Sequence, residues 1–251
     1  MQVTGSNGIF VQVALDGFSI QTESDKARHS SGWMDAGSVF TARELQCRYD
    51  DVEISLFTPK VTLVPSQFIM PGRERELLSS IADVVSSDKV YSVDIPEFAA
   101  TMIWSPSMGE KLSETLRDTV LRVDGSRADI LPELYYMLKS LSGMSQYNKI
   151  VASRADSKLY LVIAEGRSLR LCNVFDAADF TTAEYWIFSA MKSLQLNPDV
   201  SEIIFRTPLT EEEEISLCSY FRAVEAVCSS KALFDYYSDE NYRRKTEGAF
   251  D

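Results

Sequence analysis

Glycine is scarce in this sequence, and its scarcity limits the chemistry that the chain can support. Only 11 of 251 residues are Gly, and no two of them are adjacent. Phosphate-binding loops rely on glycine because the main chain must approach the ligand closely and present its amide groups. Gly143 and Gly166 are isolated and belong to no phosphate-binding loop motif. The sequence therefore gives no direct sign of a nucleotide-hydrolysing loop.

Metal ligands are also few. There is one histidine, His29, and the four cysteines form no C-x-x-C pair. A zinc site of the usual kind needs tighter clustering of Cys and His. We expect His29 to be solvated in a loop and the cysteines to be small buried hydrophobes in a reducing compartment, which predicts a cytoplasmic protein.

Long apolar runs and clusters of basic residues are missing as well. No run approaches the ~20 apolar residues that a membrane-spanning helix needs, and the segment 1–8 does not have the pattern of a secretion signal. The formal net charge is -12 and is spread over both halves of the chain. A nucleic-acid-binding surface requires clustered Lys and Arg. Membrane insertion and nucleic-acid binding are therefore not expected.

The first half of the chain alternates short strands and helices. Ile9, Val11 and Val13 alternate with other residues, Asp16-Gly17 is a favoured tight turn, and the alternation then resumes, so a hairpin is expected at the start. A Ser- and Gly-containing loop is expected at 24–37. The remaining predictions are strands at 53–57, 60–64, 90–93 and 100–104, and helices at 74–85, from Ser107 (with Glu110 completing a capping box) and at 129–142.

The second half has the clearest pattern. Three β-rich runs joined by connections of hairpin length are followed by a helix, a strand, a helix and a strand. Thr181 with Glu184, and Thr210 with Glu213, have the spacing of capping boxes. The expected strands are 149–153, 159–164, 169–175, 202–206 and 223–227, and the expected helices are 181–194 and 210–220.

This order of elements is that of a ribonuclease H-like lobe, and the first half begins in a similar way. The predicted fold class is therefore α/β with mixed sheets, in two ribonuclease H-like lobes with the architecture of an actin-like ATPase. Asp124-Gly125 breaks the chain between them. We predict a first lobe at 1–125, a second lobe at 126–230 and a tail at 231–251.

Two acidic or aromatic segments have simple structural explanations. The run Glu211 to Glu214 lies in the first turn of a predicted helix, where carboxylates complement the helix dipole and point in four directions rather than at one metal. The tail contains several aromatic residues among charges. It either docks on the body of the protein or binds a partner. These aromatic residues are Phe234, Tyr236, Tyr237 and Tyr242.

The sequence resembles an uncharacterised bacterial family, of domain-of-unknown-function status, whose members have an actin-like ATPase fold. The resemblance runs through most of the chain, and its motifs are structural. It therefore implies the fold and no particular reaction. The residues that carry it are Leu15 to Ser19, Val64-Pro65, and the stretch from Leu171 to Leu196 with Asn173-Val174-Phe175, Phe180 and Tyr185-Trp186, followed by Asn197-Pro198.

In actin-like ATPases the first hairpin turn of each lobe holds the nucleotide phosphates and its metal. The corresponding residues here are Asp16 and Gly17 in the first turn, and Asp156 and Ser157 in the second. Phe18 stands where a small residue would be expected, and the second turn has no glycine. Both aspartates are also ordinary turn residues.

The preferred hypothesis is a non-catalytic scaffold without a cofactor, which binds a protein partner or a second copy of itself. The alternative is a divergent protein that binds Mg-ATP between the lobes through Asp16, Gly17, Asp156 and Ser157. No intact ATPase motif is present, and the strands 9–15 and 149–153 lack the carboxylates that nuclease chemistry needs. We therefore expect that the protein is not an enzyme.

Overall fold

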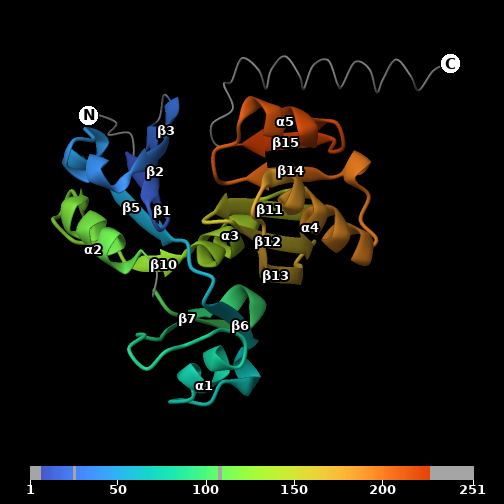
Figure 1. Ribbon diagram of the computed structural model, residues 1–251, viewed down its shortest axis with the longest axis horizontal. Coiled ribbons are helices and arrows are strands. Elements are labelled where there is room, and N and C mark those ends of the chain that lie inside the picture. Colours follow the sequence, from blue (N-terminus) through green and yellow to red (C-terminus); the bar gives the residue numbers. More distant parts are fainter. Residues whose placement is uncertain (1–6, 25–26, 107–108, 227–251) are drawn as a thin grey trace, which may run out of the picture. The chain divides into compact units, whose positions relative to one another are not determined.

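The chain folds into two compact units that divide between Ser140 and Leu141. The computed structural model describes residues 7–24, 27–106 and 109–226 (Figure 1). Each unit is built around its own five-stranded sheet, counted over these described residues. The two units are described separately below.

The first unit contains a sheet with the strand order β3-β2-β1-β5-β10. β1, β2 and β3 pair with one another in antiparallel fashion, whereas β5 pairs in parallel with β1 and β10 pairs in parallel with β5. The central strand β1 thus has three residues of one face, Ile9, Val11 and Val13, in the core. The strands are β1 (Gly8–Val13), β2 (Gly17–Ser24), β3 (Ala27–Asp35), β5 (Asp51–Leu56) and β10 (Ile130–Pro132).

The second unit repeats this plan. Its sheet has the order β13-β12-β11-β14-β15, with the first three strands antiparallel and the last two parallel to β11. α4 connects β13 to β14, and α5 connects β14 to β15. The elements are β11 (Asn148–Ala155), β12 (Lys158–Glu165), β13 (Ser168–Asp176), α4 (Phe180–Ser193), η5 (Pro198–Val200), β14 (Glu202–Phe205), α5 (Glu211–Cys218) and β15 (Ala223–Ala226).

Both five-stranded sheets therefore have the order 3-2-1-4-5 when the strands of each sheet are numbered in chain order. This is the strand order of a ribonuclease H-like lobe, and it occurs twice in the described part of the chain. The prediction of two such lobes, made from the element order alone, is confirmed.

The first unit differs from the second by what lies between its fourth and fifth strands. This insertion contains an antiparallel sheet of order β6-β8-β7, and β9 pairs with β4 outside it. Its elements are β6 (Val61–Pro65), η3 (Ser66–Phe68), α1 (Glu74–Ser79), β7 (Tyr91–Ile95), η4 (Pro96–Phe98), β8 (Ala100–Trp104), α2 (Glu110–Thr119) and β9 (Leu121–Arg122); η1 (Ala36–Phe40), η2 (Glu44–Gln46) and β4 (Arg48–Tyr49) precede β5.

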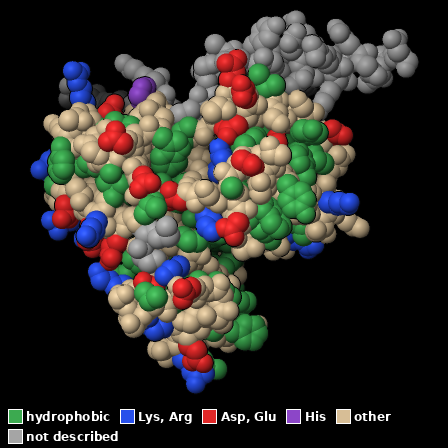
Figure 2. All heavy atoms as spheres, in the orientation of Figure 1, with side chains coloured by type: hydrophobic (Ala, Val, Ile, Leu, Met, Phe, Trp, Pro, Cys, Tyr) green, Lys and Arg blue, Asp and Glu red, His purple; other side chains and the backbone are tan. Residues whose placement is uncertain are grey.

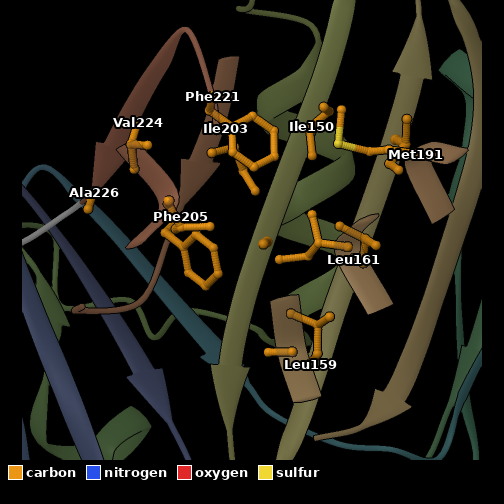
Figure 3. Packing of buried hydrophobic residues seen from close by; sticks show 14 of the residues in the cluster. Ile150, Leu159, Leu161, Met191, Ile203, Phe205, Phe221, Val224 and Ala226 are labelled. Atoms are coloured by element: carbon orange, nitrogen blue, oxygen red, sulfur yellow. The ribbon is translucent and has the colours of Figure 1, made fainter. Parts of the chain in front are cut away.

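The core of the second unit lies between one face of its sheet and the helices α4 and α5. Ile150, Leu159 and Leu161 line this core from the strands, Met191 of α4 lies beside Ile150, and Phe205 and Phe221 lie on the other side (Figure 3). Four of these six residues are fully buried, and Phe221 and Met191 are 1% exposed. Tyr160 and Val162, on the other face of β12, are buried as well, so both faces of the strand are covered and its apolar residues form an almost continuous run rather than an alternation.

Helix starts in the second unit depend on single polar side chains. The predicted capping box of Thr210 and Glu213 is present at the start of α5. At α4, however, the N-cap is Asp179, whose carboxylate accepts from the Thr182 amide at 2.7 Å, so Thr181 already lies inside the helix. The predicted box with Glu184 is therefore wrong, because a better N-cap residue lies two positions earlier.

The first unit departs from the sequence prediction in three further places. The loop expected at 24–37 contains β3, and His29 is exposed on this strand, opposite Thr22. The helix expected at 74–85 ends at Ser79. The helix expected at 129–142 is preceded by β10 and starts at Glu133 as α3 (Glu133–Leu141). The Ser107 cap and the tail 231–251 lie outside the described residues.

The pairing of β10 also moves the boundary between the units. A lobe boundary at residue 125 would assign β10 and α3 to the second lobe. Ile130 pairs with Ile54, so β10 completes the first sheet, and the division falls after Ser140 instead. Asp124-Gly125 is a local turn, in which the Gly125 amide donates to the Arg122 carbonyl at 2.9 Å.

Among the helices that the structure describes, none combines the length and the apolar character that a membrane span needs.

The core of the second unit predicts a large effect of truncation. Leu161→Ala should lower the free energy of unfolding by about 2–5 kcal/mol, because it leaves a cavity between β12 and α4. Urea unfolding followed by circular dichroism measures this. The matched control is Val200→Ala, which truncates a side chain that is 61% exposed and should change stability by less than about 0.5 kcal/mol. Equal effects of the two substitutions would contradict this account of the core.

Candidate functional site

The first candidate site is the turn between β1 and β2. The Ala14 amide donates to the Gly17 carbonyl at 2.8 Å, which closes the turn, and the Ala36 amide donates to the Asp16 carbonyl at 3.2 Å. Asp16 itself is exposed. Its side chain is thus presented to solvent while its main chain is held by the end of β3.

Gly17 is required by the fold at this turn. A Cβ atom built at Gly17 would lie 2.3 Å from the main-chain oxygen of Met34 on β3. No such contact is tolerated between real atoms, so β3 can approach β2 closely only because residue 17 has no side chain. The glycine therefore has a structural reason that does not involve a phosphate.

Phe18 does not stand in the turn, contrary to the expectation from the sequence. It pairs with Val13 on one side and Met34 on the other, and its side chain is fully buried. Because successive residues of a strand point to opposite faces, the ring enters the core of the first unit. Phe18 contributes to stability and does not obstruct the turn.

The second candidate site is the turn between β11 and β12. The antiparallel ladder continues to the pair Ala155 and Lys158, so the turn consists only of Asp156 and Ser157. Both have positive φ, 52° and 57°, and the Ala177 amide donates to the Ser157 carbonyl at 2.9 Å. Two left-handed residues are typical of a type I′ hairpin turn, which is the shortest common hairpin loop.

Arg154 precedes this turn, and its side chain is held by the second unit itself. Its Nη2 atom lies 2.5 Å from Oε1 of Glu213 on α5, and its guanidinium lies 5.5 Å from the ring centroid of Phe180. The Arg154 amide donates to the Thr207 hydroxyl at 3.0 Å. The charge of Arg154 is therefore neutralised by a carboxylate, and Lys158, directly after the turn, pairs with Asp176. Asp179 caps α4 just before Phe180.

Asp16 and Gly17 belong to the first unit, and Asp156 and Ser157 belong to the second. Within each unit the structure brings the predicted pair together in one turn. Their joint use for one nucleotide remains a prediction. No group of three or more His, Cys, Asp or Glu side chains suited to a metal ion occurs in the described segments.

A buried polar cluster in the first unit was missed by the sequence analysis. Gln12, Ser55 and Glu133 are all fully buried and lie at the carboxyl ends of the three parallel strands β1, β5 and β10. The Gln12 amide donates to Oε1 of Glu133 at 3.1 Å, and the Ser55 hydroxyl donates to Oε2. A second glutamine, Gln21, donates to Oε1 of Gln12 at 3.4 Å.

This cluster lies where open α/β sheets usually bind their ligands, at the carboxyl ends of the strands. Here, however, the carboxylate of Glu133 already accepts hydrogen bonds on both oxygens. A buried carboxylate whose two oxygens both accept hydrogen bonds from its own fold joins β1, β5 and the start of α3. The only sequence signal was a polar residue on an otherwise apolar strand, which is equally typical of a solvated face.

α3 covers this same face of the first sheet. Tyr136 packs edge-to-face on Phe10 of β1, with 5.4 Å between ring centroids, and Nζ of Lys139 lies 2.5 Å from Oε1 of Glu53. Burial raises the pKa of Tyr136 above its ordinary value, with a smaller contribution from the charge of Glu53. The helix thus shields the buried glutamate from water.

The fold and the paired turns define this protein as one of the actin-like ATPase fold class. The chain belongs to the family described as "Protein of unknown function (DUF3822)", which it matches over residues 18–224. No curated protein matches the chain.

Two solved structures share the fold over nearly the whole chain. One is a Bacteroides thetaiotaomicron protein with an actin-like ATPase fold and unknown function. It is 16% identical in sequence, the match covers 89% of the present chain and 91% of the Bacteroides protein, and the TM-score is 0.59. The other is the PilM-PilN type IV pilus biogenesis complex, with 14% identity, coverage of 93% and 96%, and a TM-score of 0.50. These similarities confirm the predicted fold and the resemblance to a family of unknown function.

The close approach at Gly17 predicts a clear difference between two glycines at the ends of neighbouring strands. Gly17→Ala should destabilise the protein by about 1–3 kcal/mol, because the new methyl group forces β2 and β3 apart. Gly8→Ala is the control, since a Cβ there meets nothing within 4 Å, and it should be neutral or slightly stabilising. Urea midpoints distinguish the two. A neutral Gly17→Ala would show that the turn can relax.

The buried cluster predicts that Glu133→Gln destabilises the protein by about 1–3 kcal/mol, although the side chain keeps its size. In the glutamine, one accepting oxygen of the carboxylate becomes an NH2 group, which is a donor. It would face the Gln12 amide or the Ser55 hydroxyl, both of which donate in this cluster, so a buried donor is left unsatisfied. Glu97→Gln, at an exposed position, should have no effect. Denaturant unfolding of both variants measures the difference, and an unchanged midpoint for Glu133→Gln would argue against the hydrogen-bonded cluster.

Proposed function

We propose that this protein is a non-catalytic scaffold that uses the actin-like fold to bind another protein. The observation that carries the proposal is that several residues in the first turn and at the strand ends beside the two turns are engaged by the fold. Glu133 is bonded to Gln12 and Ser55, Arg154 is paired with Glu213, and Gly17 serves the approach of β3. These groups would have to be released before they could serve a phosphate or a metal.

The comparison with solved structures supports an interaction role. A similar fold occurs in the PilM-PilN complex, which is an assembly of two proteins. Two rigid lobes offer a scaffold several faces for such contacts. The proposal for this chain is accordingly a protein partner or a second copy of the chain, without a cofactor and without catalytic activity.

A cytoplasmic location fits this proposal. Cys47 is a free but exposed thiol, so the prediction that the cysteines are buried is wrong for this residue. Cys172 and Cys218 are free and half-buried, and burial raises the pKa of Cys172 to about 12, which makes it unreactive at neutral pH. Such thiols serve as small apolar side chains in reducing compartments. Cys228 lies outside the described residues.

A second candidate function, Mg-ATP binding, is favoured by one observation. Asp16 and Asp156 are exposed carboxylates in equivalent hairpin turns of two lobes with the same strand order. Carboxylates in these turns are the groups that would hold the metal and its waters, with Gly17 and Ser157 beside them. This candidate is kept as the alternative that the next experiment separates from the first.

The scaffold proposal predicts no change in melting temperature when millimolar Mg-ATP is added to the full chain. A ligand present at a hundred times its Kd stabilises the folded state by about 2.7 kcal/mol, which a thermal melt detects. Differential scanning fluorimetry, supported by calorimetric titration, is the measurement.

Asp16→Asn provides the matched test. Asparagine is also a good turn residue, so stability should stay nearly unchanged. If Mg-ATP stabilises the natural protein and Asp16→Asn removes this stabilisation, the nucleotide candidate replaces the scaffold. If light scattering shows a monomer and this monomer hydrolyses ATP, the nucleotide candidate would likewise replace the scaffold.

A further inference from the structure

The outer surface of α4 and α5 exposes two large aromatic side chains. Tyr185 on α4 is 62% exposed, and Tyr220, just after α5, is 51% exposed. Apolar side chains gather over α4 in the space-filling view (Figure 2). Large exposed aromatic groups that lie close together mark interaction surfaces more often than isolated ones do.

Contacts between the two helices place these groups on one face. The Ser216 hydroxyl donates to Oε1 of Glu184 at 2.6 Å, and Phe188 lies edge-to-face on Tyr220 with 5.0 Å between ring centroids. Tyr185 lies at i, i+3 from Phe188, and Glu184 lies at i, i+4 from it, so each is a neighbour of Phe188 on the surface of α4. We call this surface the α4–α5 face; its residues are Glu184, Tyr185, Phe188, Glu212, Ser216 and Tyr220.

The aromatic rings of this region are held in place by other rings. Tyr185 contacts Trp186 at 5.3 Å, and Trp186 stacks on Phe175 at 4.9 Å with an interplanar angle of 20°. The Trp186 indole N–H donates to the Asp176 carbonyl at 2.9 Å. Rings that are already ordered lose little entropy when a partner binds, which favours affinity.

The charge of this surface is mainly negative, although Lys192 is exposed one turn after Phe188. α5 begins with four glutamates and contains no Lys or Arg, and α4 has a single Lys at its end. Glu213 is neutralised by Arg154, whereas Glu211 and Glu212 are exposed. Glu212 lies one turn from Ser216, which contacts Glu184, so it borders the aromatic side chains. A complementary partner must be cationic and must also bring apolar side chains.

We propose that the α4–α5 face binds a cationic amphipathic helix of a partner protein. The proposal rests on the scaffold function and names the surface and the chemistry of the partner. Leu or similar residues at i, i+3, i+4 and i+7 would contact Tyr185, Phe188 and Tyr220, and Lys or Arg beside them would meet Glu184 and Glu212. Recognition of an amphipathic helix combines apolar anchors with charges at the rim.

The probe is a synthetic helical peptide of Leu and Lys, titrated into the full chain by calorimetry. Because the protein carries a charge of -12, a cation alone could bind weakly anywhere. Two controls address this: a peptide with the same composition but scrambled Leu positions, and a peptide with Glu in place of Lys. Saturable one-to-one binding of the first peptide alone is expected. Equal binding of the scrambled peptide would overturn the proposal.

Variants locate the binding surface. Tyr185→Ala combined with Tyr220→Ala should raise the Kd for the Leu/Lys peptide at least about tenfold, since exposed aromatic anchors carry most of the binding energy of such sites. Glu212→Gln should weaken binding about two- to threefold and reduce its dependence on salt. Phe68→Ala, which truncates an aromatic residue that is 61% exposed on η3, is the matched control and should leave the Kd unchanged.

The outcomes separate this inference from the scaffold proposal. Unchanged affinity in the double Tyr variant, or an equal loss in Phe68→Ala, would reject the α4–α5 face and leave the scaffold untouched. Self-association by light scattering that disappears in the double Tyr variant would assign the face to a second copy of the chain and would equally reject the cationic partner. Stabilisation by Mg-ATP would count against the scaffold instead. Circular dichroism confirms that each variant is folded.

Discussion

Each half of this protein depends on a central strand that pairs in two different ways. β1 pairs antiparallel with β2 and parallel with β5, and β11 pairs antiparallel with β12 and parallel with β14. The antiparallel side allows a tight hairpin turn, whereas the parallel side needs a long crossover. In the second unit that crossover is α4, which together with α5 covers one face of the sheet. The position of the turns and of the outward helix surface both follow from this mixed pairing.

The same pairing explains why polar groups are buried near the strand ends. Parallel strands bring their carboxyl ends to one edge, where many proteins of this architecture admit a ligand. In this protein Gln12, Ser55 and Glu133 satisfy one another at that edge of the first unit, and Arg154 is satisfied by Glu213 in the second. The edge is thus stabilised from within. Tyr185 and Tyr220, with the exposed Glu211 and Glu212, lie on and beside the outer helices, and we assign the interaction role to this surface.

Local patterns were sufficient where a segment's neighbours in sequence decide its structure. The strand predicted at 100–104 is β8 in full, and the capping box of Thr210 and Glu213 starts α5 as expected. They failed where a distant partner decides. Residues 27–35 have little apolar alternation and form β3 because β2 supplies the hydrogen bonds, and Ile130 is a strand residue because β5 pairs with it.

The sequence by itself determined the fold class, because the order of hairpins and crossovers in the second half admits few topologies. It also determined that the chain contains no glycine-rich motif of the kind that binds phosphate. Only the tertiary structure decided why Gly17 must be glycine, that Phe18 belongs to the core, and that Glu133 joins two strands and a helix. These contacts join residues far apart in the chain, such as Gln12 and Glu133, and no local periodicity reports them. The exposure of Tyr185 was likewise decided by packing. The aromatic residues of α4 lie on several sides of the helix, so the elements packed against it determine which ring meets water.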